Sequence, residues 1–321
     1  MTSHTSKPAN TTSNTIRLAG YQGDASILTQ ALKNLAHGVQ SRLPGQSCDL
    51  DIDVTASGQS ANALFASIET GDRQIAYMAS SYLSARVPEL GVLDIPFSVS
   101  DRAHALAALD TGAGDMIKHA VAEKTAYHVL GFWDNGFRHI SNRIRPIRSP
   151  QDCTGLLIRT LDNEDYRSLL AALGFTARTI DVKDLVRAVG SGEVDAQENP
   201  LTNLLTFSLW RYHSYVSLTG HFFGVLLLVC HRDWFFGLSA QAQAQLTLAV
   251  NEATQLQRQL ASAADALALD ELRAHGVEIL EPQEIDMTAF RQQADQVILK
   301  ASQALNPDLI RAYLGNPISF L

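Results

Sequence analysis

The sequence predicts an α/β protein in which helices flank a parallel β-sheet. Short apolar runs typical of strands alternate with segments whose apolar residues recur at helical spacing. The chain has 321 residues, 46% of them apolar and 18% charged, which is enough for two domains with cores of ordinary size. The stretch 239–275 contains neither Pro nor Gly, and it predicts one helix too long for a single small domain.

In the first half of the chain, strands and helices are expected to alternate. The spacing of apolar residues predicts the type of each element, and Gly, Pro and Ser residues mark where each strand or helix begins and ends. The predicted strands cover 16–20, 49–55 and 75–78, the predicted helices 26–43, 61–69 and 101–109, and the segment 90–97 is expected to be extended.

The second half continues the pattern and ends with the long helix. Ser239 is the expected N-cap of that helix, and Gly276 ends it. The other predicted elements are strands at 127–133, 155–159 and 224–229, a proline-set extended piece at 143–147, and helices at 163–173 and 182–189.

One polar stretch, 192–200, stands out between apolar flanks. It holds three carboxylates and two side-chain amides within nine residues. Because a buried carboxylate or amide without a partner costs several kcal/mol, the composition predicts a loop rather than a core segment. The excess of polar groups further indicates a site, and the pair Glu193 and Asp195 is compatible with acid–base chemistry.

Composition and absent motifs exclude several classes of function. The net charge of -8 argues against nucleic-acid binding. Cysteine and histidine spacing gives no disulfide framework and no metal site, and no nucleotide-binding loop or hydrolase elbow is present. We therefore expect no cofactor, no metal and no catalytic residue.

The chain shows no run of about 18 apolar residues, so the sequence predicts no membrane span. Residues 1–15 are rich in Ser, Thr and Asn and predict a disordered leader without the apolar region of a secretory signal. Two interpretations stay open: a signal was removed or mis-started, or the protein remains in the cytoplasm.

Several motifs, in order, resemble one family. They are Val-Pro-Glu-Leu-Gly-Val-Leu-Asp-Ile-Pro-Phe at 87–97, Gly-Phe-Arg at 136–138, Arg-Pro-Ile at 145–147, Gly-Leu-Leu-Ile-Arg at 155–159, Val-Asp-Ala-Gln-Glu-Asn-Pro at 194–200 and Thr-Gly-His at 219–221. Over residues 16–300 the chain resembles substrate-binding proteins of tripartite ATP-independent periplasmic (TRAP) transporters, of the C4-dicarboxylate-receptor type.

The resemblance implies a two-domain clamshell of the periplasmic-binding-protein type. Each domain is a sheet flanked by helices, and hinge strands and one long helix join them. The expected division places 16–136 plus 225–263 in domain I and 137–224 plus 264–321 in domain II.

The function implied is that of a non-enzymatic receptor in the periplasm. It would capture a small organic acid anion and deliver it to the small and large membrane subunits of the transporter. Two alternatives remain at this stage. One is a cytoplasmic organic-acid sensor or carrier of the same fold, and the other is an α/β enzyme that uses the acidic loop.

The resemblance also implies the binding residues. The arginine of this family that matches Arg159 forms the salt bridge to the ligand carboxylate, and the residues that match Arg138 and Asn199 assist it. A planar guanidinium offers a bidentate fork to carboxylate, and an amide donates without adding charge. The remaining candidates are residues at strand ends expected to face the cleft, together with a histidine of the last motif: Tyr21, Gln22, Trp133, Asp134, Phe222 and His221.

Structural alternatives and departures from the family pattern limit this interpretation. Arg159 is equally compatible with a surface or interdomain salt bridge, and Trp133 is equally compatible with a position in the core. Arg138 could pair with Asp134, and Glu198 is expected to hold its own loop in shape. Ala196 replaces a frequent glycine, and the helix 182–189 lacks a frequent tyrosine. The ligand's shape therefore stays open among dicarboxylates, 2-oxo acids, sugar acids and aromatic acids.

Overall fold

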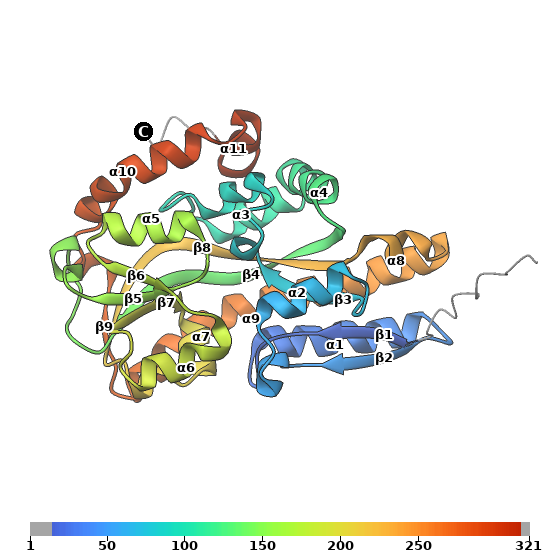
Figure 1. Cartoon of the computed structure of the whole chain (residues 1–321), viewed down its shortest axis with the longest axis horizontal. Helices are drawn as coiled ribbons and strands as arrows, with labels where there is room; N and C mark the ends of the chain where they lie inside the picture. Colours follow the sequence, from blue (N-terminus) through green and yellow to red (C-terminus); the bar gives the residue numbers. More distant parts are fainter. Residues whose placement is uncertain (1–14, 316–321) are drawn as a thin grey trace, which may run out of the picture.

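The computed structural model describes residues 15–315 and consists of two lobes built on one continuous mixed sheet (Figure 1). Within the described residues the sheet has nine strands, in the order β2-β1-β3-β8-β4-β7-β5-β6, with β9 paired to β8. The strands are β1 (Thr15–Ala19), β2 (Ser47–Asp51), β3 (Ile75–Ala79), β4 (Tyr127–Asn142), β5 (Leu157–Thr160), β6 (Thr176–Thr179), β7 (Ala196–Pro200), β8 (Tyr215–His231) and β9 (Glu278–Leu280).

The predicted parallel sheet is wrong, because β4 and β8 run antiparallel to each other and to the adjacent strands β7 and β3. β3–β8, β4–β8 and β4–β7 are antiparallel pairs, whereas β1 pairs with β2 and β3, and β5 with β6 and β7, in parallel. β4 also extends beyond its predicted end at residue 133. It passes Gly136, whose φ of 80° lies in the left-handed region, and continues to Asn142.

β4 and β8 are the strands shared by the two lobes. They pair from Tyr127↔His231 in the first lobe to Asn142↔Tyr215 in the second, with irregularities on either side of Gly136. Because β-bulges bend a strand and increase its twist, they change the direction of the sheet where it passes between the lobes. The side chains that follow this bend, from Phe137 onward, are placed at the junction of the lobes.

Helices cover both faces of the sheet. The predicted helices are confirmed with small changes in their ends. The helices α4, α7, α8, α10 and α11 were not predicted, and the start of α4, Gly112-Ala113-Gly114, gives no helical signal. The helices are α1 (Ile27–Arg42), α2 (Ala61–Glu69), α3 (Arg102–Leu109), α4 (Gly112–Lys124), α5 (Glu164–Ala172), α6 (Val182–Gly190), α7 (Leu201–Thr206), α8 (Arg232–Gly237), α9 (Ala240–Ala274), α10 (Met287–Gln303) and α11 (Pro307–Leu314).

Two predicted extended segments are partly 3₁₀-helix in the structure. The segment expected to be extended at 90–97 contains most of η3 (Pro88–Asp94), which begins with a proline at its first turn. The predicted second strand ends at Asp51, and η1 (Val54–Ser57) follows, capped by the side chain of Asp53. In both cases an apolar alternation was compatible with a helical turn as well as with a strand.

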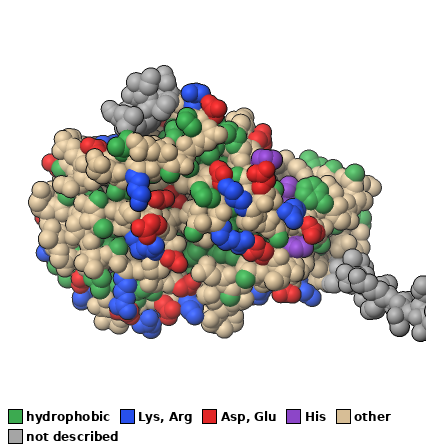
Figure 2. Space-filling model, turned by 45° about the horizontal axis from the view of Figure 1, so that its top comes forward, with side chains coloured by type: hydrophobic (Ala, Val, Ile, Leu, Met, Phe, Trp, Pro, Cys, Tyr) green, Lys and Arg blue, Asp and Glu red, His purple; other side chains and the backbone are tan. Residues whose placement is uncertain are grey.

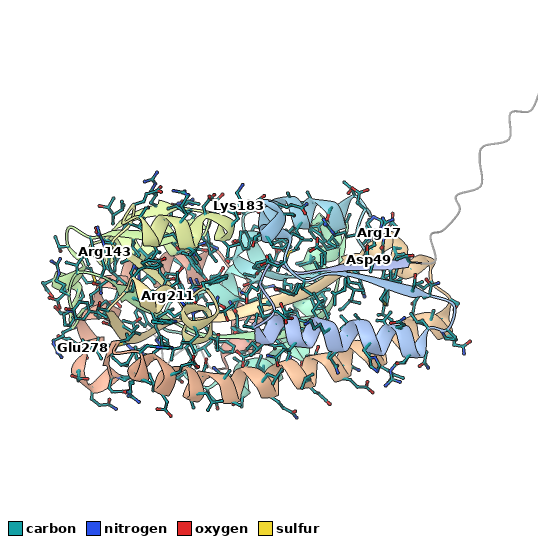
Figure 3. All side chains as sticks on the ribbon, turned by 90° about the horizontal axis from the view of Figure 1, so that it is seen from below. Arg17, Asp49, Arg143, Lys183, Arg211 and Glu278 are labelled. Carbon is teal, nitrogen blue, oxygen red and sulfur yellow. The ribbon has the colours of Figure 1, made fainter. Side chains whose placement is uncertain are left out.

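Helix α9 confirms the predicted long helix at 239–275. Ser239 caps its N-terminus, and Gly276 follows its end with φ 81°. The helix has 35 residues, or about 52 Å at 1.5 Å per residue, and it runs along the lower edge of the molecule in Figure 3, beside α1. A Cβ on Gly38 would lie 3.1 Å from the Cβ of Ala249, so small residues allow α1 and α9 to pack closely.

The buried apolar residues form separate clusters in the two lobes. The largest packs β1, β3 and the first-lobe parts of β4 and β8 against α1 to α4, and a second surrounds β5, α5 and α10. Leu309, Ile310 and Tyr313 of α11 belong to the first cluster, so we propose to move 305–314 from domain II, where the sequence placed them, to domain I.

The predicted disordered leader lies outside the described residues except for Thr15, which begins β1. Within residues 15–315 no helix is both long and apolar enough to cross a membrane. Figure 2 shows Lys, Arg, Asp and Glu side chains intermixed over one face of the molecule, without a large area of one sign there.

Candidate functional site

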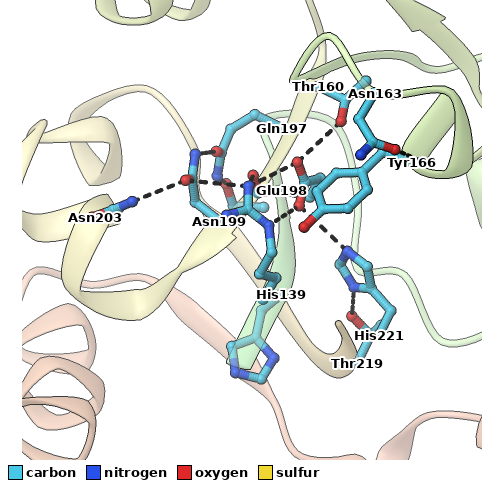
Figure 4. A network of polar contacts seen from close by, with 12 residues as sticks. His139, Thr160, Asn163, Tyr166, Gln197, Glu198, Asn199, Asn203, Thr219 and His221 are labelled. Atoms are coloured by element: carbon cyan, nitrogen blue, oxygen red, sulfur yellow. Dashed lines mark hydrogen bonds and ion pairs between the residues drawn. The ribbon is translucent and has the colours of Figure 1, made fainter. Parts of the chain in front are cut away.

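The polar stretch predicted as a loop is largely a buried strand. β7 holds Ala196 to Pro200, all of them buried, between β4 on one side and β5 on the other. The prediction was wrong because it assumed polar side chains without partners, whereas here they bind one another and their neighbours (Figure 4). Polar groups are stable in a core when their hydrogen bonds are satisfied.

Glu198 forms a buried ion pair with Arg138. Nε of Arg138 donates to Oε2, and Nη2 donates to Oε1 at 2.9 Å and to the backbone carbonyl of Glu198 at 2.8 Å. Burial would raise the pKa of Glu198, but the guanidinium of Arg138 outweighs it, so the pKa falls to about 2. Thr160 donates a further hydrogen bond to Oε1 at 3.1 Å. Glu198 therefore stays ionised and fully paired at neutral pH.

Aromatic rings pack against one side of the Arg138 guanidinium. Its guanidinium carbon lies 5.5 Å from the ring centroid of Tyr166, and Tyr166 stacks on Phe222 with centroids 4.1 Å apart. Nε2 of His221 lies 3.6 Å from the Glu198 carboxylate, while its Nδ1 bonds with Thr219. Because burial lowers the pKa of His221, the ring is neutral and Arg138 is the cation that balances Glu198.

A chain of amides leads from the second lobe to the first. The Asn199 amide donates to the side-chain oxygen of Gln197, and Nδ2 of Asn203 donates to Oδ1 of Asn199 at 3.1 Å. Nε2 of Gln22, in the first lobe, then donates to Oδ1 of Asn203 at 3.4 Å. Oε1 of Gln22 accepts from the hydroxyl of Ser26, the N-cap of α1. The chain links the two lobes directly beside the site.

Arg159 differs from Arg138 because no carboxylate neutralises it. It is 1% exposed, its Nε donates to the carbonyl of Ile180 at 2.9 Å, and its Nη2 has no hydrogen-bond partner among the described residues. Burial lowers the pKa of its guanidinium, which still remains protonated at neutral pH, since arginine normally titrates above 12. A buried and unpaired cation of this kind favours an anion.

Arg159 opens into a small cavity between the lobes. The cavity is small, with a volume of about 30 Å³. Tyr82 also lines it, and its hydroxyl is likewise buried without a partner among the described residues. Its lining residues are Tyr21, Gln22, Ala79, Tyr82, Asn135, Arg138, Arg159, Leu161, Val182, Asn199, Asn203 and Phe207.

The structure brings together the predicted site residues Tyr21, Gln22, Arg138, Arg159 and Asn199, which all line this cavity. The alternative that Arg159 forms an interdomain salt bridge is not realised, because no carboxylate of the described residues lies within 4.0 Å of its side-chain nitrogens. The expected structural role of Glu198 is observed, although within a strand and with Arg138 as its partner.

The other predicted site residues lie outside the cavity lining, which corrects their expected positions. Trp133 is fully buried beside Tyr77, and its indole donates to Thr254 of α9. Asp134 is also fully buried and pairs with Arg102 rather than Arg138. Both side chains pack into the first lobe because β4 continues past them.

Phe222 and His221 likewise support the site from behind without lining it. Phe222 is opposite Arg138 in the β4–β8 register, and its ring stacks on the ring of Tyr166. His221 is fully buried beside Glu198. Their positions follow from β8 running through the junction of the lobes. Neither side chain reaches the cavity that Arg159 lines.

Sequence reasoning missed several lining residues, above all Tyr82 and Asn203. Tyr82 follows β3 in a short 3₁₀ turn (η2, Ser80–Tyr82), so the rule that sites gather at strand ends could have found it. Asn203 lies in α7, the helix that directly follows β7. Among residues 15–315 no group of His, Cys, Asp or Glu is arranged to hold a metal ion.

Comparisons with known proteins agree with this fold. Residues 18–304 match the family model described as "Bacterial extracellular solute-binding protein, family 7", and the chain belongs to this family. A solute-binding protein of Verminephrobacter eiseniae is 29% identical over 223 residues, which is 70% of this chain and 66% of that protein. The periplasmic protein YiaO of Escherichia coli is 29% identical over 230 residues, or 72% of this chain and 69% of YiaO.

Solved structures give the same answer for the fold. A TRAP periplasmic solute-binding protein from Ralstonia eutropha superimposes with a TM-score of 0.86 and is 25% identical, over 94% of this chain and 98% of that one. The two-lobe architecture with shared strands is therefore that of TRAP solute-binding proteins, as the resemblance predicted.

Proposed function

We propose that the protein is the solute receptor of a TRAP transporter and that it binds a small organic acid anion through Arg159. The observation that carries this proposal is the buried guanidinium of Arg159, which lines the interlobe cavity and whose Nη2 has no partner among the described residues. A carboxylate accepts two hydrogen bonds from such a group in one plane. The Tyr82 hydroxyl supplies a further donor at the same cavity.

The relatives support a carboxylate as ligand. YiaO is described as binding 2,3-diketo-L-gulonate, and the Ralstonia structure holds (S)-2-acetolactate. Both ligands are organic acid anions, which suits a site built around a single unpaired guanidinium. We extend to this chain the binding of an organic acid, but not either particular ligand.

Binding is proposed to close the two lobes around the anion. The bond between Gln22 and Asn203 joins the lobes at the cavity, so a ligand that contacts both sides favours the closed form. Excluding water strengthens the ion pair between ligand and Arg159. We further propose that the closed complex acts in the periplasm, where it delivers the acid, chemically unchanged, to the small and large membrane subunits of the transporter.

The test is calorimetric titration of the variant Arg159→Ala with an acid that stabilises the wild type in a thermal-shift screen. We expect the variant to lose about 2–5 kcal/mol of binding free energy, because the ligand carboxylate is left buried without its partner. Arg178→Ala is the matched control, since Arg178 is opposite Arg159 in the β5–β6 register but is exposed and pairs with Glu193.

An Arg159→Ala variant that binds the acid as tightly as the wild type would remove Arg159 from the site. Recovery of the bound acid after incubation, by mass spectrometry, separates a receptor from an enzyme. A receptor returns the ligand unchanged, whereas any chemical conversion contradicts the proposal.

A further inference from the structure

Asn135 lines the interlobe cavity from a β-bulge in β4. Asp134 is opposite Val225 in the register of β4 and β8. Gly136, two residues further on, is opposite Gly224, which directly precedes Val225. Asn135 is thus an extra residue without an opposite residue in β8, and a bulge of this kind redirects a side chain. The side-chain amide of Asn135 forms no hydrogen bond with the described residues, so it is available to a ligand.

Gly224 leaves room for the Asn135 side chain. A Cβ atom on Gly224 would lie 3.0 Å from the Cβ of Asn135 and 3.2 Å from its Nδ2. Any side chain at position 224 would therefore crowd the Asn135 amide. A glycine inside a strand weakens the strand, and it is typical of places where another group approaches closely. Here the group that approaches is the side chain of Asn135.

Gln257 of α9 fixes the backbone immediately before Asn135. The backbone N–H of Asp134 donates to Oε1 of Gln257 at 2.8 Å, and Nε2 of Gln257 donates to the carbonyl of Asp134 at 2.6 Å. Gln257 is fully buried, so its amide requires partners of this kind. Helix α9 therefore holds the residue from which the bulge begins.

The carboxylate of Asp134 spans the bulge. Its Oδ1 accepts from the backbone N–H of Gly136 at 2.7 Å, two residues further along β4. Its Oδ2 lies 3.3 Å from Nε of Arg102, and the same guanidinium pairs with Asp265 of α9. The residues before and after Asn135 are therefore both held by groups outside the cavity. These contacts also give a role to Asp134, which is fully buried and does not line the cavity.

From the bulge and its supports we infer that Asn135 is a further ligand-binding residue and that Gln257 and Asp134 position it. The inference rests on the proposed receptor function and adds a contact to that site. A neutral amide both donates and accepts, so Asn135 suits a hydroxyl or oxo oxygen on the body of the acid, while Arg159 binds the carboxylate. Gln257 and Asp134 act by holding the backbone that carries the Asn135 side chain.

The first test is calorimetric titration of Asn135→Ala with acids that stabilise the wild type in a thermal-shift screen. The matched pairs are malate and succinate, 2-hydroxybutyrate and butyrate, and 2-oxopentanoate and pentanoate, extended to further hydroxy and oxo acids with their deoxy analogues. We expect the hydroxy or oxo acid to bind about three- to tenfold more weakly, because one hydrogen bond is lost, and the deoxy acid to bind as before.

Three outcomes of this titration overturn the inference. The first is unchanged binding of the hydroxy or oxo acid, and the second is an equal loss for both acids of a pair. The third is binding by the wild type that is confined to acids without a hydroxyl or oxo group.

The second test asks whether Gln257 acts through Asn135. Gln257→Met keeps the length of the side chain and removes both hydrogen bonds to Asp134. We expect the affinity for the hydroxy or oxo acid to fall about threefold or more, and this loss to be absent when the change is made in Asn135→Ala. A role confined to stability would lower the thermal transition without this dependence. Gln259→Met, an exposed change two residues further along α9, is the control.

The same loss of affinity in both backgrounds contradicts the positioning role. Should Gln257→Met fail to fold, Arg102→Gln replaces it in the same comparison, because it removes the ion pair with Asp134 from a partly exposed position.

The variant Arg159→Ala separates this inference from the receptor function. Binding that is lost in Arg159→Ala but unchanged in Asn135→Ala supports the receptor and overturns the role of Asn135. If no organic acid binds the wild type, the receptor function itself fails, and the role of Asn135 fails with it.

Discussion

Asp94 provides a prediction about stability that depends on pH. It is 2% exposed at the end of η3, and the amide of Asn163, the N-cap of α5, donates to its Oδ2 at 3.1 Å. The pKa of Asp94 rises to about 7, first through burial and second through repulsion by Asp165. A hydrogen bond from Tyr166 and the charge of Arg138 oppose this rise without cancelling it.

The sign of the effect follows from proton uptake. In the unfolded chain Asp94 titrates near its ordinary value of 3.8, so between pH 4 and 7 the folded protein holds the proton more tightly. The associated stability is fully present below the unfolded pKa and is lost as the pH rises through about 7. The difference between the two pKa values corresponds to ~4 kcal/mol at neutral to alkaline pH.

The variant Asp94→Asn removes this penalty and keeps an oxygen that accepts from Asn163. We expect it to unfold in urea with a free energy about 1–3 kcal/mol above the wild type at pH 8, because the amide recovers part of the lost stability. At pH 4.5 the advantage should disappear. Asp295→Asn, an exposed change on α10, serves as control. A variant with the same difference from the wild type at both pH values would refute the assignment.

Two further variants test the site. Asn203→Ala removes the hydrogen bonds of Asn203 with Gln22 and Asn199. We expect ligand binding, measured by calorimetry, to weaken by about 0.5–1.5 kcal/mol. The control Thr202→Ala, on the same helix, should leave ligand binding unchanged. Arg138→Ala leaves the Glu198 carboxylate buried without its cation. We expect this variant to lower the free energy of unfolding in urea by about 3–5 kcal/mol. A variant as stable as the wild type would contradict the structural role of the ion pair.

Much of the fold could be predicted from local patterns. The helices α1, α2, α5, α6 and α9 follow from apolar spacing and from caps such as Ser26, Asn163 and Ser239, whose side chains accept the expected backbone hydrogen bonds. The direction of the strands could not be predicted this way. Antiparallel pairing of β4 and β8 is set by contacts between residues about 90 positions apart, for which single segments carry no signal.

The site could be predicted only in part, because its geometry also depends on the pairing of distant strands. Arg159, Arg138 and Asn199 stand at recognisable motif positions, and they do line one cavity. Trp133 and Asp134 were assigned to the cleft because the strand was expected to end at them, but the bend at Gly136 lies beyond and turns later residues toward the junction. The error in the strand's end thus became an error in the site.

Arg138 and Arg159 have the same side chain but different surroundings, because β7 places a carboxylate beside Arg138 and none beside Arg159. Burying Glu198 would be unfavourable alone, and burying Arg138 alone equally so, but together they satisfy each other at the base of the cavity. Arg159 is opposite Gln197 rather than Glu198 in the β5–β7 register, so the strand supplies it with no carboxylate. No carboxylate of the described residues forms a salt bridge with Arg159, so the guanidinium remains able to pair with a bound anion. The carboxylate at 198 therefore pairs Arg138 within the protein, and Arg159 is the lining guanidinium without such a partner among the described residues.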